Sequence, residues 1–328
     1  MNKSSPVLQE YLQAPSLFGK PLVRLLTVLF LVLLFVLPLV AWYTGNRFYI
    51  DFATRLVCLS IAAVSLNLIL GFGGLVSFGH AVYIGIGAYS VGIPAYYGYE
   101  SGFLHIPVAV GISAIFALIT GAISLRTKGV YFIMITMAFA QMAFYFFVSL
   151  EEYGGDDGLT LYSRSTFGSF SIEDKVTFFV LCFAVLLASL YLVFRLAHSR
   201  FGMVLRGAQS NENRMRALGV NVYLYRLTAY VIAGVLCGLA GALMGNFQSF
   251  ISPDMMGWTR SGELMFMVIL GGAGSIFGPV FGVVGFVVIE EVLSSFTTHW
   301  ALPFGILLIL AVLFVKGGMN GLLQRIGR

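Results

Sequence analysis

The chain has 328 residues, of which 19 are Lys or Arg and 14 are Asp or Glu, so only 10% carry a charge. Hydrophobic residues make up 59% of the chain, and its mean hydropathy is +0.93. A soluble domain carries roughly 25% charged residues, far more than this chain could place on a water-exposed surface. The composition therefore excludes a soluble enzyme, a disordered chain and a secreted disulfide scaffold, and it leaves the membrane class.

Long stretches of the sequence contain no charged residue, and a helix of about 20 apolar residues is enough to cross a bilayer. We therefore expect an all-α, polytopic membrane protein of about ten transmembrane or half-membrane helices with Gly-rich breaks. The expected segments are 24–44, 50–70, 79–98, 104–125, 129–150, 176–195, 227–247, 262–274, 279–298 and 300–315. The first segment is too long for the apolar core of a signal peptide, and no small-residue cleavage site follows it, so we expect a retained span.

The basic residues indicate which side of the membrane each loop occupies. With the N-terminus in the cytoplasm, 14 of the 19 basic residues fall on the cytoplasmic side, as the positive-inside rule requires. The C-terminus is then also cytoplasmic, provided that the chain breaks within 271–279. A single long crossing over 264–289 would place it outside, but the glycines and Pro279 make a poor helix interior there.

Two glycine-rich segments interrupt the apolar stretches and share a Gly-Gly, Ser, Phe-Gly pattern, the first within 71–80 and the second within 271–279. Broken helices at corresponding positions are the sequence signal of a transport pathway built on an internal repeat. Tight helix packing through small residues is the alternative reading. The candidate pathway residues are Gly73, Gly74, Ser77, Gly79, His80, Thr136, Gln141, Gly271, Gly272, Gly274, Ser275 and Gly278.

His80 is the one titratable side chain in the charge-free stretch 56–99, apart from tyrosines and Cys58. An ionisable residue inside the membrane is a functional hypothesis by default. A buried neutral histidine with a satisfied hydrogen bond and a proton relay both fit the sequence. The three cysteines lie in apolar stretches without a CxxC pattern, so no zinc or redox motif is expected.

The longest cytoplasmic stretch, 195–226, holds six basic residues and one acidic residue. Ser210 or Asn211 can cap a short helix running through Leu218, and Gly219 is a natural stop. Such a helix resembles a docking knob for a cytoplasmic partner. A basic loop contacting anionic lipid is the alternative.

Several motifs, in order along residues 50–320, are similar to those of the branched-chain amino acid permeases of ABC transporters, of the LivM type. The matching segments are Gly73–Ala81, Gly85–Tyr89, Arg126–Phe132, Gly154–Leu159, Asn211–Asn221, Gly238–Ala242 and Leu270–Pro279. Asp156 replaces the Ser or Thr that is usual in the outer-loop motif.

The resemblance implies a permease domain over 24–317 with a cytoplasmic coupling loop at 196–226, between cytoplasmic tails at 1–23 and 318–328. It implies a second permease subunit as heterodimer partner, two ABC ATPase subunits, a periplasmic or extracellular solute-binding protein, and a bacterial inner-membrane location. The ATPase-coupling residues are then Asn211, Glu212, Arg214, Arg216, Ala217, Leu218 and Gly219. The outer docking loop comprises Gly155, Asp156, Asp157 and Gly158.

No phosphate-binding loop occurs in the sequence, since Gly19-Lys20-Pro21 lacks the earlier Gly and the following Ser or Thr. We therefore expect no enzyme activity and no bound cofactor in this chain, with ATP and Mg used by the partner subunits. The resemblance implies inward transport of branched-chain or related small hydrophobic amino acids. The alternative substrates for the same machinery are urea, short amides or other small organic acids. A gradient-driven secondary transporter and a purely structural subunit remain the alternatives of other classes.

Overall fold

The structure, a computed structural model, describes residues 21–46, 48–162, 164–167, 170–171, 173–314, 317–319 and 321. The expected N-terminal tail up to residue 20 and most of the expected C-terminal tail lie outside these residues. The same holds for the basic residues Lys3, Lys20, Arg47, Lys316, Arg325 and Arg328.

The described chain is built from helices, as the composition predicts, with two very small sheets. The longer helices are α2 (Pro21–Tyr43), α3 (Phe48–Leu70), α4 (Val82–Tyr96), α5 (Gly102–Ser124), α6 (Val130–Val148), α7 (Lys175–His198), α8 (Arg200–Ser210), α10 (Val222–Gln248), α11 (Trp258–Gly271), α12 (Gly278–Phe296) and α13 (Ala301–Phe314). The short elements are η1 (Glu151–Tyr153), η2 (Gly155–Asp157), β1 (Leu159–Thr160), β2 (Thr166–Phe167), β3 (Phe170–Ser171), α9 (Glu212–Ala217), β4 (Phe250–Ile251) and η3 (Pro253–Met256).

Each of the ten expected membrane segments corresponds to one of these helices. Among the described residues, seven helices are long and apolar enough to cross a membrane, and α4, α11 and α13 are shorter. Both expected breaks are confirmed, because α3 ends at Leu70 before α4 begins at Val82, and α11 ends at Gly271 before α12 begins at Gly278. The number ten is thus a count of full and partial crossings together.

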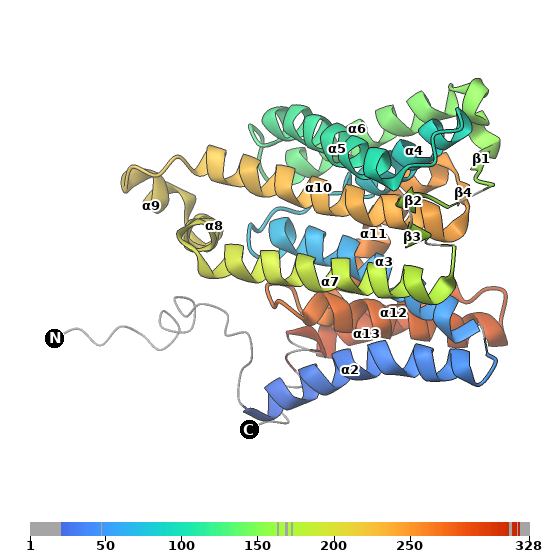
Figure 1. The fold of residues 1–328 in the computed structure, drawn as a ribbon. Coiled ribbons are helices and arrows are strands. Elements are labelled where there is room, and N and C mark those ends of the chain that lie inside the picture. The colour runs from blue at the N-terminus through green and yellow to red at the C-terminus, as the bar shows by residue number, and fades with distance from the viewer. Residues whose placement is uncertain are drawn as a thin grey trace.

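The helices lie side by side, and α8 and α9 project from one end of the bundle (Figure 1). We call this the α8–α9 end; α2 also begins there. The opposite end, which we call the strand end, carries β1 paired with β4 and β2 paired with β3, both antiparallel. The apolar helices therefore separate the end that carries α8 and α9 from the end that carries the strands.

Helix α3 is the centre of the bundle and packs against α7, α10, α11 and α12. In its membrane-spanning window 89% of the residues are buried, against 17% for α2. Buried hydroxyls on α3 are satisfied within the helix, as when Ser60 Oγ donates to the carbonyl of Leu56 at 2.7 Å. Because these hydroxyls are satisfied within the helix, α3 can be buried on most sides, while α2 leaves most of its apolar surface outward.

Helix α4 crosses α10 at a backbone-to-backbone contact. A Cβ atom at Gly87 would lie 1.9 Å from the carbonyl oxygen of Gly238, and one at Gly241 would lie 2.0 Å from that of Ile84. Only glycine permits this approach, which is how membrane helices gain packing energy without a hydrophobic driving force. The motifs Gly85–Tyr89 and Gly238–Ala242 therefore face each other across one helix crossing.

Candidate translocation and coupling sites

The two glycine-rich breaks lie against each other in the folded chain. Asn67, near the end of α3, donates from Nδ2 to the carbonyl of Ser275 at 2.8 Å. Its Oδ1 accepts from the backbone N–H of Gly274 at 2.9 Å. One buried amide thus satisfies two backbone groups that the second break leaves without helical partners.

Close backbone approach explains the glycines at this junction. A Cβ atom at Gly71 would lie 2.3 Å from the backbone nitrogen of Gly274. Gly274 itself has a φ of +81°, a backbone conformation that other residues adopt only at a cost. Steric fit and backbone geometry therefore both require glycine where the breaks meet.

The polar residues predicted for the pathway in the first break and on the adjacent part of α6 are packed inside protein. Ser77, His80 and Thr136 expose 1%, 0% and 1% of their surfaces. A Cβ atom at Gly79 would lie 2.4 Å from the carbonyl oxygen of Thr136, so the break presses directly on α6. At this level the first break and α6 are therefore packed against each other without open space between Gly79 and Thr136.

His80 has a polar partner, Ser65 on α3. Its Nε2 lies 2.9 Å from Ser65 Oγ, while its Nδ1 is buried without a hydrogen-bond partner among the described residues. Cys237 Sγ lies 3.5 Å from the His80 carbonyl oxygen. The side chain thus joins α3 to the first break through one of its two ring nitrogens.

The structure does not gather all the predicted pathway residues. Gln141 is half-exposed on α6, off the buried stripe that carries Phe132, Thr136 and Ala140. In the second break, Ser275 Oγ donates to the carbonyl of Gly272 at 2.7 Å, which closes a local turn before α12. Gly271 and Gly278 pack backbone to backbone, since a Cβ atom at Gly271 would lie 1.9 Å from the Gly278 carbonyl oxygen.

The predicted coupling helix is present as α9 at the α8–α9 end. Asn211, rather than Ser210, is its N-cap, because Asn211 Oδ1 accepts from the backbone N–H of Arg214 at 3.0 Å and Ser210 ends α8. The helix stops at Ala217, and Gly219 follows with a φ of +79°. Leu218, at the tip, is 71% exposed.

Glu212 ties α9 to the rest of the chain. Its carboxylate pairs with Lys128 at 2.9 Å in the α5–α6 turn, with Arg226 at 3.1 Å on α10, and with Arg216 one turn along α9. Only 14% of the Glu212 side chain is exposed. The motif at Arg126–Phe132 therefore supplies a cation that fixes α9 between two longer helices.

The charge environment of Glu212 shifts its titration. Partial burial by itself raises the pKa of this carboxyl, but the hydrogen bond from Lys128 and the charges of Arg226, Lys128 and Arg216 outweigh that effect. The net result is a pKa below the ordinary value. Glu212 is therefore ionised at neutral pH and the cluster stays intact.

The α8–α9 end also touches both breaks directly. A Cβ atom at Gly74, in the first break, would lie 2.7 Å from the side chain of Gln209 on α8. A Cβ atom at Gly318, beyond α13, would lie 2.5 Å from the backbone nitrogen of Gly272 in the second break. A displacement at this end can therefore reach the breaks through one layer of contacts.

The predicted outer docking loop forms a tight turn at the strand end. Asp156 and Asp157 are exposed on η2, and Gly155 is buried beneath them. Gly154 has a φ of +88°, and a Cβ atom there would lie 2.0 Å from the Gly158 carbonyl oxygen. The glycines thus hold the two carboxylates outward.

Sequence reasoning missed two features of this region. Asn67 was read as part of an ordinary span, although an amide four residues before a glycine-rich segment in an apolar stretch was a usable signal. The pairing of Arg260 with Glu263 beside a cavity was also missed, and i, i+3 spacing of opposite charges on a helix was the available signal.

These features define a polytopic helical membrane protein with two apposed helix breaks and a capped knob at one end. Residues 48–315 match the family described as branched-chain amino acid transport system / permease component, and the chain belongs to this family.

Individual relatives agree with the family assignment. The chain is 28% identical over 317 residues to the high-affinity branched-chain amino acid transport system permease protein LivM of Salmonella typhimurium, covering 89% of this chain and 74% of the relative. It is 24% identical over 313 residues to a probable LivM of Methanocaldococcus jannaschii, covering 79% and 89%. The permease protein LivH of Escherichia coli is 28% identical over 144 residues, covering 43% and 46%. No solved structure shows significant similarity to the chain.

Proposed function

We propose that this chain is a transmembrane permease subunit of an ATP-driven importer that moves branched-chain amino acids inward. The observation that carries the proposal is α9: a capped helix with an exposed tip, fixed by Glu212 to α10 and to the α5–α6 turn. A partner that pushes on α9 would therefore act at once on α10 and on the α5–α6 turn. Membership of the permease family supplies the substrate class.

The α8–α9 end is the cytoplasmic side in this proposal, and both chain termini are cytoplasmic. Six of the basic residues lie in 195–226, which agrees with the positive-inside rule. The strand end then faces outward, where Asp156 and Asp157 offer charges to a solute-binding protein with basic patches. In bacteria the membrane is the inner membrane.

The proposed assembly contains two permease subunits, two ABC ATPases and the binding protein. Both LivM and LivH permeases are among the relatives, which supports a second permease as partner. This chain would bind no cofactor, and ATP with Mg would be used by the ATPases. A conformational equilibrium shifts only if a ligand binds its two states differently, and ATP closing the ATPases supplies that difference.

Transmission would run from α9 to the breaks. Moving α9 displaces Lys128 and Arg226, while α8 carries Gln209 against Gly74. The first break presses on Thr136, and Asn67 links it to the second break. Separation of these packed segments would open the passage past Ser77 and His80.

The proposal is tested by placing a charge at the tip of α9. In the complete transporter reconstituted in vesicles, Leu218→Glu should abolish ATP-driven leucine uptake and weaken ATPase association at least tenfold. Tyr162→Glu is the control, because Tyr162 is 100% exposed near β1 at the opposite end and should leave ATPase association unchanged. If the Leu218→Glu transporter still binds the ATPases and takes up leucine normally, α9 is not the docking site.

The same vesicles separate the rival functions. Wild-type uptake should require ATP and the binding protein. Uptake that persists without ATP and follows a proton gradient would instead establish a secondary transporter. Transport of urea, amides or small acids in place of leucine would reassign the substrate within the same machinery.

A further inference from the structure

A cavity of about 290 Å³ lies where β4 and η3 lead into α11. Its lining residues are Gln248, Phe250, Ser252, Asp254, Met255, Thr259, Arg260 and Glu263. Small-molecule sites have volumes of roughly 300–1,000 Å³, so this cavity suits a ligand of the smallest class. Its lining combines apolar side chains with opposite charges.

Arg260 and Glu263 form an ion pair, one turn apart on α11. Their side chains are 31% and 35% exposed, so both charges can be reached by a ligand. A guanidinium has five N–H donors in a planar fork, and the carboxylate at Glu263 occupies only part of it.

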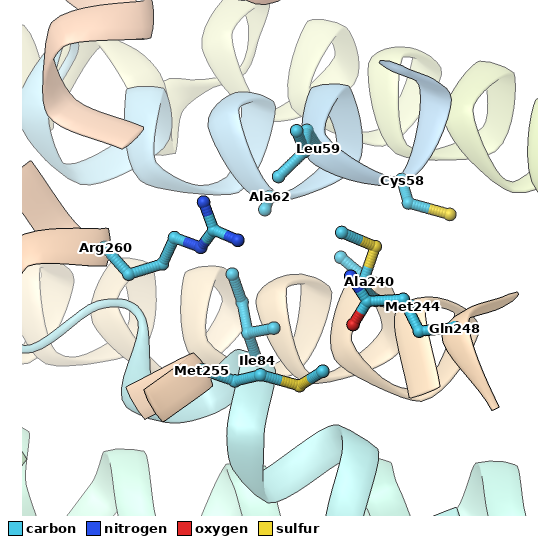
Figure 2. Close-up of a pocket in the computed structure, with 9 residues that line it drawn as sticks. All are labelled: Cys58, Leu59, Ala62, Ile84, Ala240, Met244, Gln248, Met255 and Arg260. Carbon is cyan, nitrogen blue, oxygen red and sulfur yellow. The ribbon is translucent and has the colours of Figure 1, made fainter. Parts of the chain in front are cut away.

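The guanidinium of Arg260 extends from α11 into the space between α3 and α10 (Figure 2). This second, smaller pocket has a volume of about 10 Å³, which is room for one water molecule at most. Its lining is Cys58, Leu59, Ala62, Ile84, Ala240, Met244, Gln248, Met255 and Arg260. The charged group therefore stands at the boundary between the polar cavity and an apolar recess.

The cavity adjoins the first glycine-rich break. Ser261, the next residue on α11, accepts through Oγ a hydrogen bond from the backbone N–H of Ala81 at 3.0 Å. A Cβ atom at Gly262 would lie 3.8 Å from the ring of Phe78. From this point α11 leads directly to the second break at Gly272. The cavity thus lies on the strand side of the closed junction.

We propose that Arg260 and Glu263 bind the charged end of an aliphatic α-amino acid before the breaks open. The guanidinium takes the α-carboxylate, and the carboxylate of Glu263 takes the α-ammonium. The aliphatic side chain lies along the apolar side chains of Phe250 and Met255, which line the same cavity. A zwitterion entering an ion pair leaves the net charge of the site unchanged, which limits the desolvation penalty.

This inference rests on the proposed function and names the substrate site within it. An ion pair that only holds helices together is the competing explanation. Arg55 and Glu290 provide a matched comparison, because they pair at 3.1 Å between α3 and α12 with side chains 28% and 20% exposed. Neither residue is among those that line the two cavities.

The first test uses leucine uptake by the complete transporter in vesicles. Arg260→Gln and Glu263→Gln should each lower initial uptake at least tenfold, whereas Arg55→Gln and Glu290→Gln should stay within about threefold of wild type. The exchanged pair Arg260→Glu with Glu263→Arg should not restore uptake, because the ligand's two charges would then meet the wrong partners. Uptake within twofold of wild type for Arg260→Gln, or recovery in the exchanged pair, would overturn the site.

The second test reads binding without transport. Thr259→Cys places a thiol in the cavity of the complete transporter, where Cys58, Cys182 and Cys237 are buried. A membrane-impermeant maleimide should label it from the strand side, and free leucine at millimolar concentration should slow labelling at least threefold. Isoamylamine and 4-methylpentanoate, which each lack one charged group, should not protect.

The two proposals fail in different ways. Absence of ATP-dependent uptake by the wild-type transporter would refute the proposed function whatever the labelling shows. Absence of leucine protection at Thr259→Cys, or equal protection by the two analogues, would refute the site even if uptake is normal. Because the labelling comparison uses a single variant with Arg260 in place, it does not depend on the folding of the charge variants.

Discussion

Asn67 on α3 and Gly274 in the second break are 207 residues apart in the chain, yet the Asn67 amide accepts a hydrogen bond from the Gly274 backbone at 2.9 Å. The same amide donates to the Ser275 carbonyl at 2.8 Å. Helix breaks at membrane depth are tolerated only when protein or water satisfies their backbone groups. Asn67 performs this role and also fixes the second break against the first.

Replacement of Asn67 by Leu keeps the branching at Cγ and removes both hydrogen bonds. We expect a loss of about 1–3 kcal/mol in stability, because two buried backbone groups lose their partners. Thermal denaturation of the purified transporter in detergent, with uptake measured in parallel, checks this. Ser60→Ala is the control on the same helix, since its hydroxyl bonds only within α3. A melting temperature equal to that of the control would contradict the bridging role.

Gly87 and Gly111 offer a matched pair for the crossing of α4 and α10. A methyl group at Gly87 would lie 1.9 Å from the Gly238 carbonyl oxygen, whereas one at Gly111 on α5 meets nothing within 4 Å. Gly87→Ala should destabilise the chain by about 1–3 kcal/mol or more through overpacking, and Gly111→Ala should be neutral. Fluorescence-detected size-exclusion after a temperature series distinguishes them, and equal profiles would refute the close crossing.

Glu212→Gln should release α9 from Lys128 and Arg226. Loss of hydrogen bonds to charged groups costs about 1.5–3 kcal/mol, and here the cost falls on the junction of α9 with α10 and the α5–α6 turn. We expect ATPase association to weaken at least fivefold while detergent stability changes little, because the bundle core is untouched. Pull-down of the ATPases measures this, with Glu152→Gln on η1 as control.

The same cluster predicts a pH dependence with a defined sign. The pKa of Glu212 is lowered in the folded chain, so the cluster's contribution is complete above the ordinary carboxyl pKa and is lost as pH falls through the lowered value. ATPase association should therefore be constant from pH 6 to 8 and fall on acidification below about 4.5. In Glu212→Gln this part of the acid dependence should be absent.

Much of this architecture was predictable from the sequence. Spans such as 50–70 and 129–150 agree with α3 and α6 to within two residues, because apolar length alone determines where a helix can lie in lipid. The breaks were predictable because glycine and proline interrupt the apolar stretches. The cap at Asn211 and the stop at Gly219 follow from local backbone chemistry.

Other features depend on contacts between distant segments. The sequence predicts a basic loop where the structure has α8. Its buried face, with Leu205 and Ala208, forms only when neighbouring helices cover these residues. Gln141 was placed in the pathway because it is polar, but its position on α6 turns it off the buried stripe. Arg260 and Glu263 belong to none of the sequence motifs, and only folding places them beside one cavity.

The sequence by itself determined that the chain is a helical membrane protein, where its helices break, and which end carries the basic knob. These properties follow from local composition, because lipid admits only helices that satisfy their own backbone. The tertiary structure alone decided that Asn67 joins the two breaks, that Glu212 gathers three cations, and that Arg260 borders a cavity. Such relations depend on how helices cross, and crossings are set by backbone contacts such as Gly87 against Gly238, which no single segment encodes.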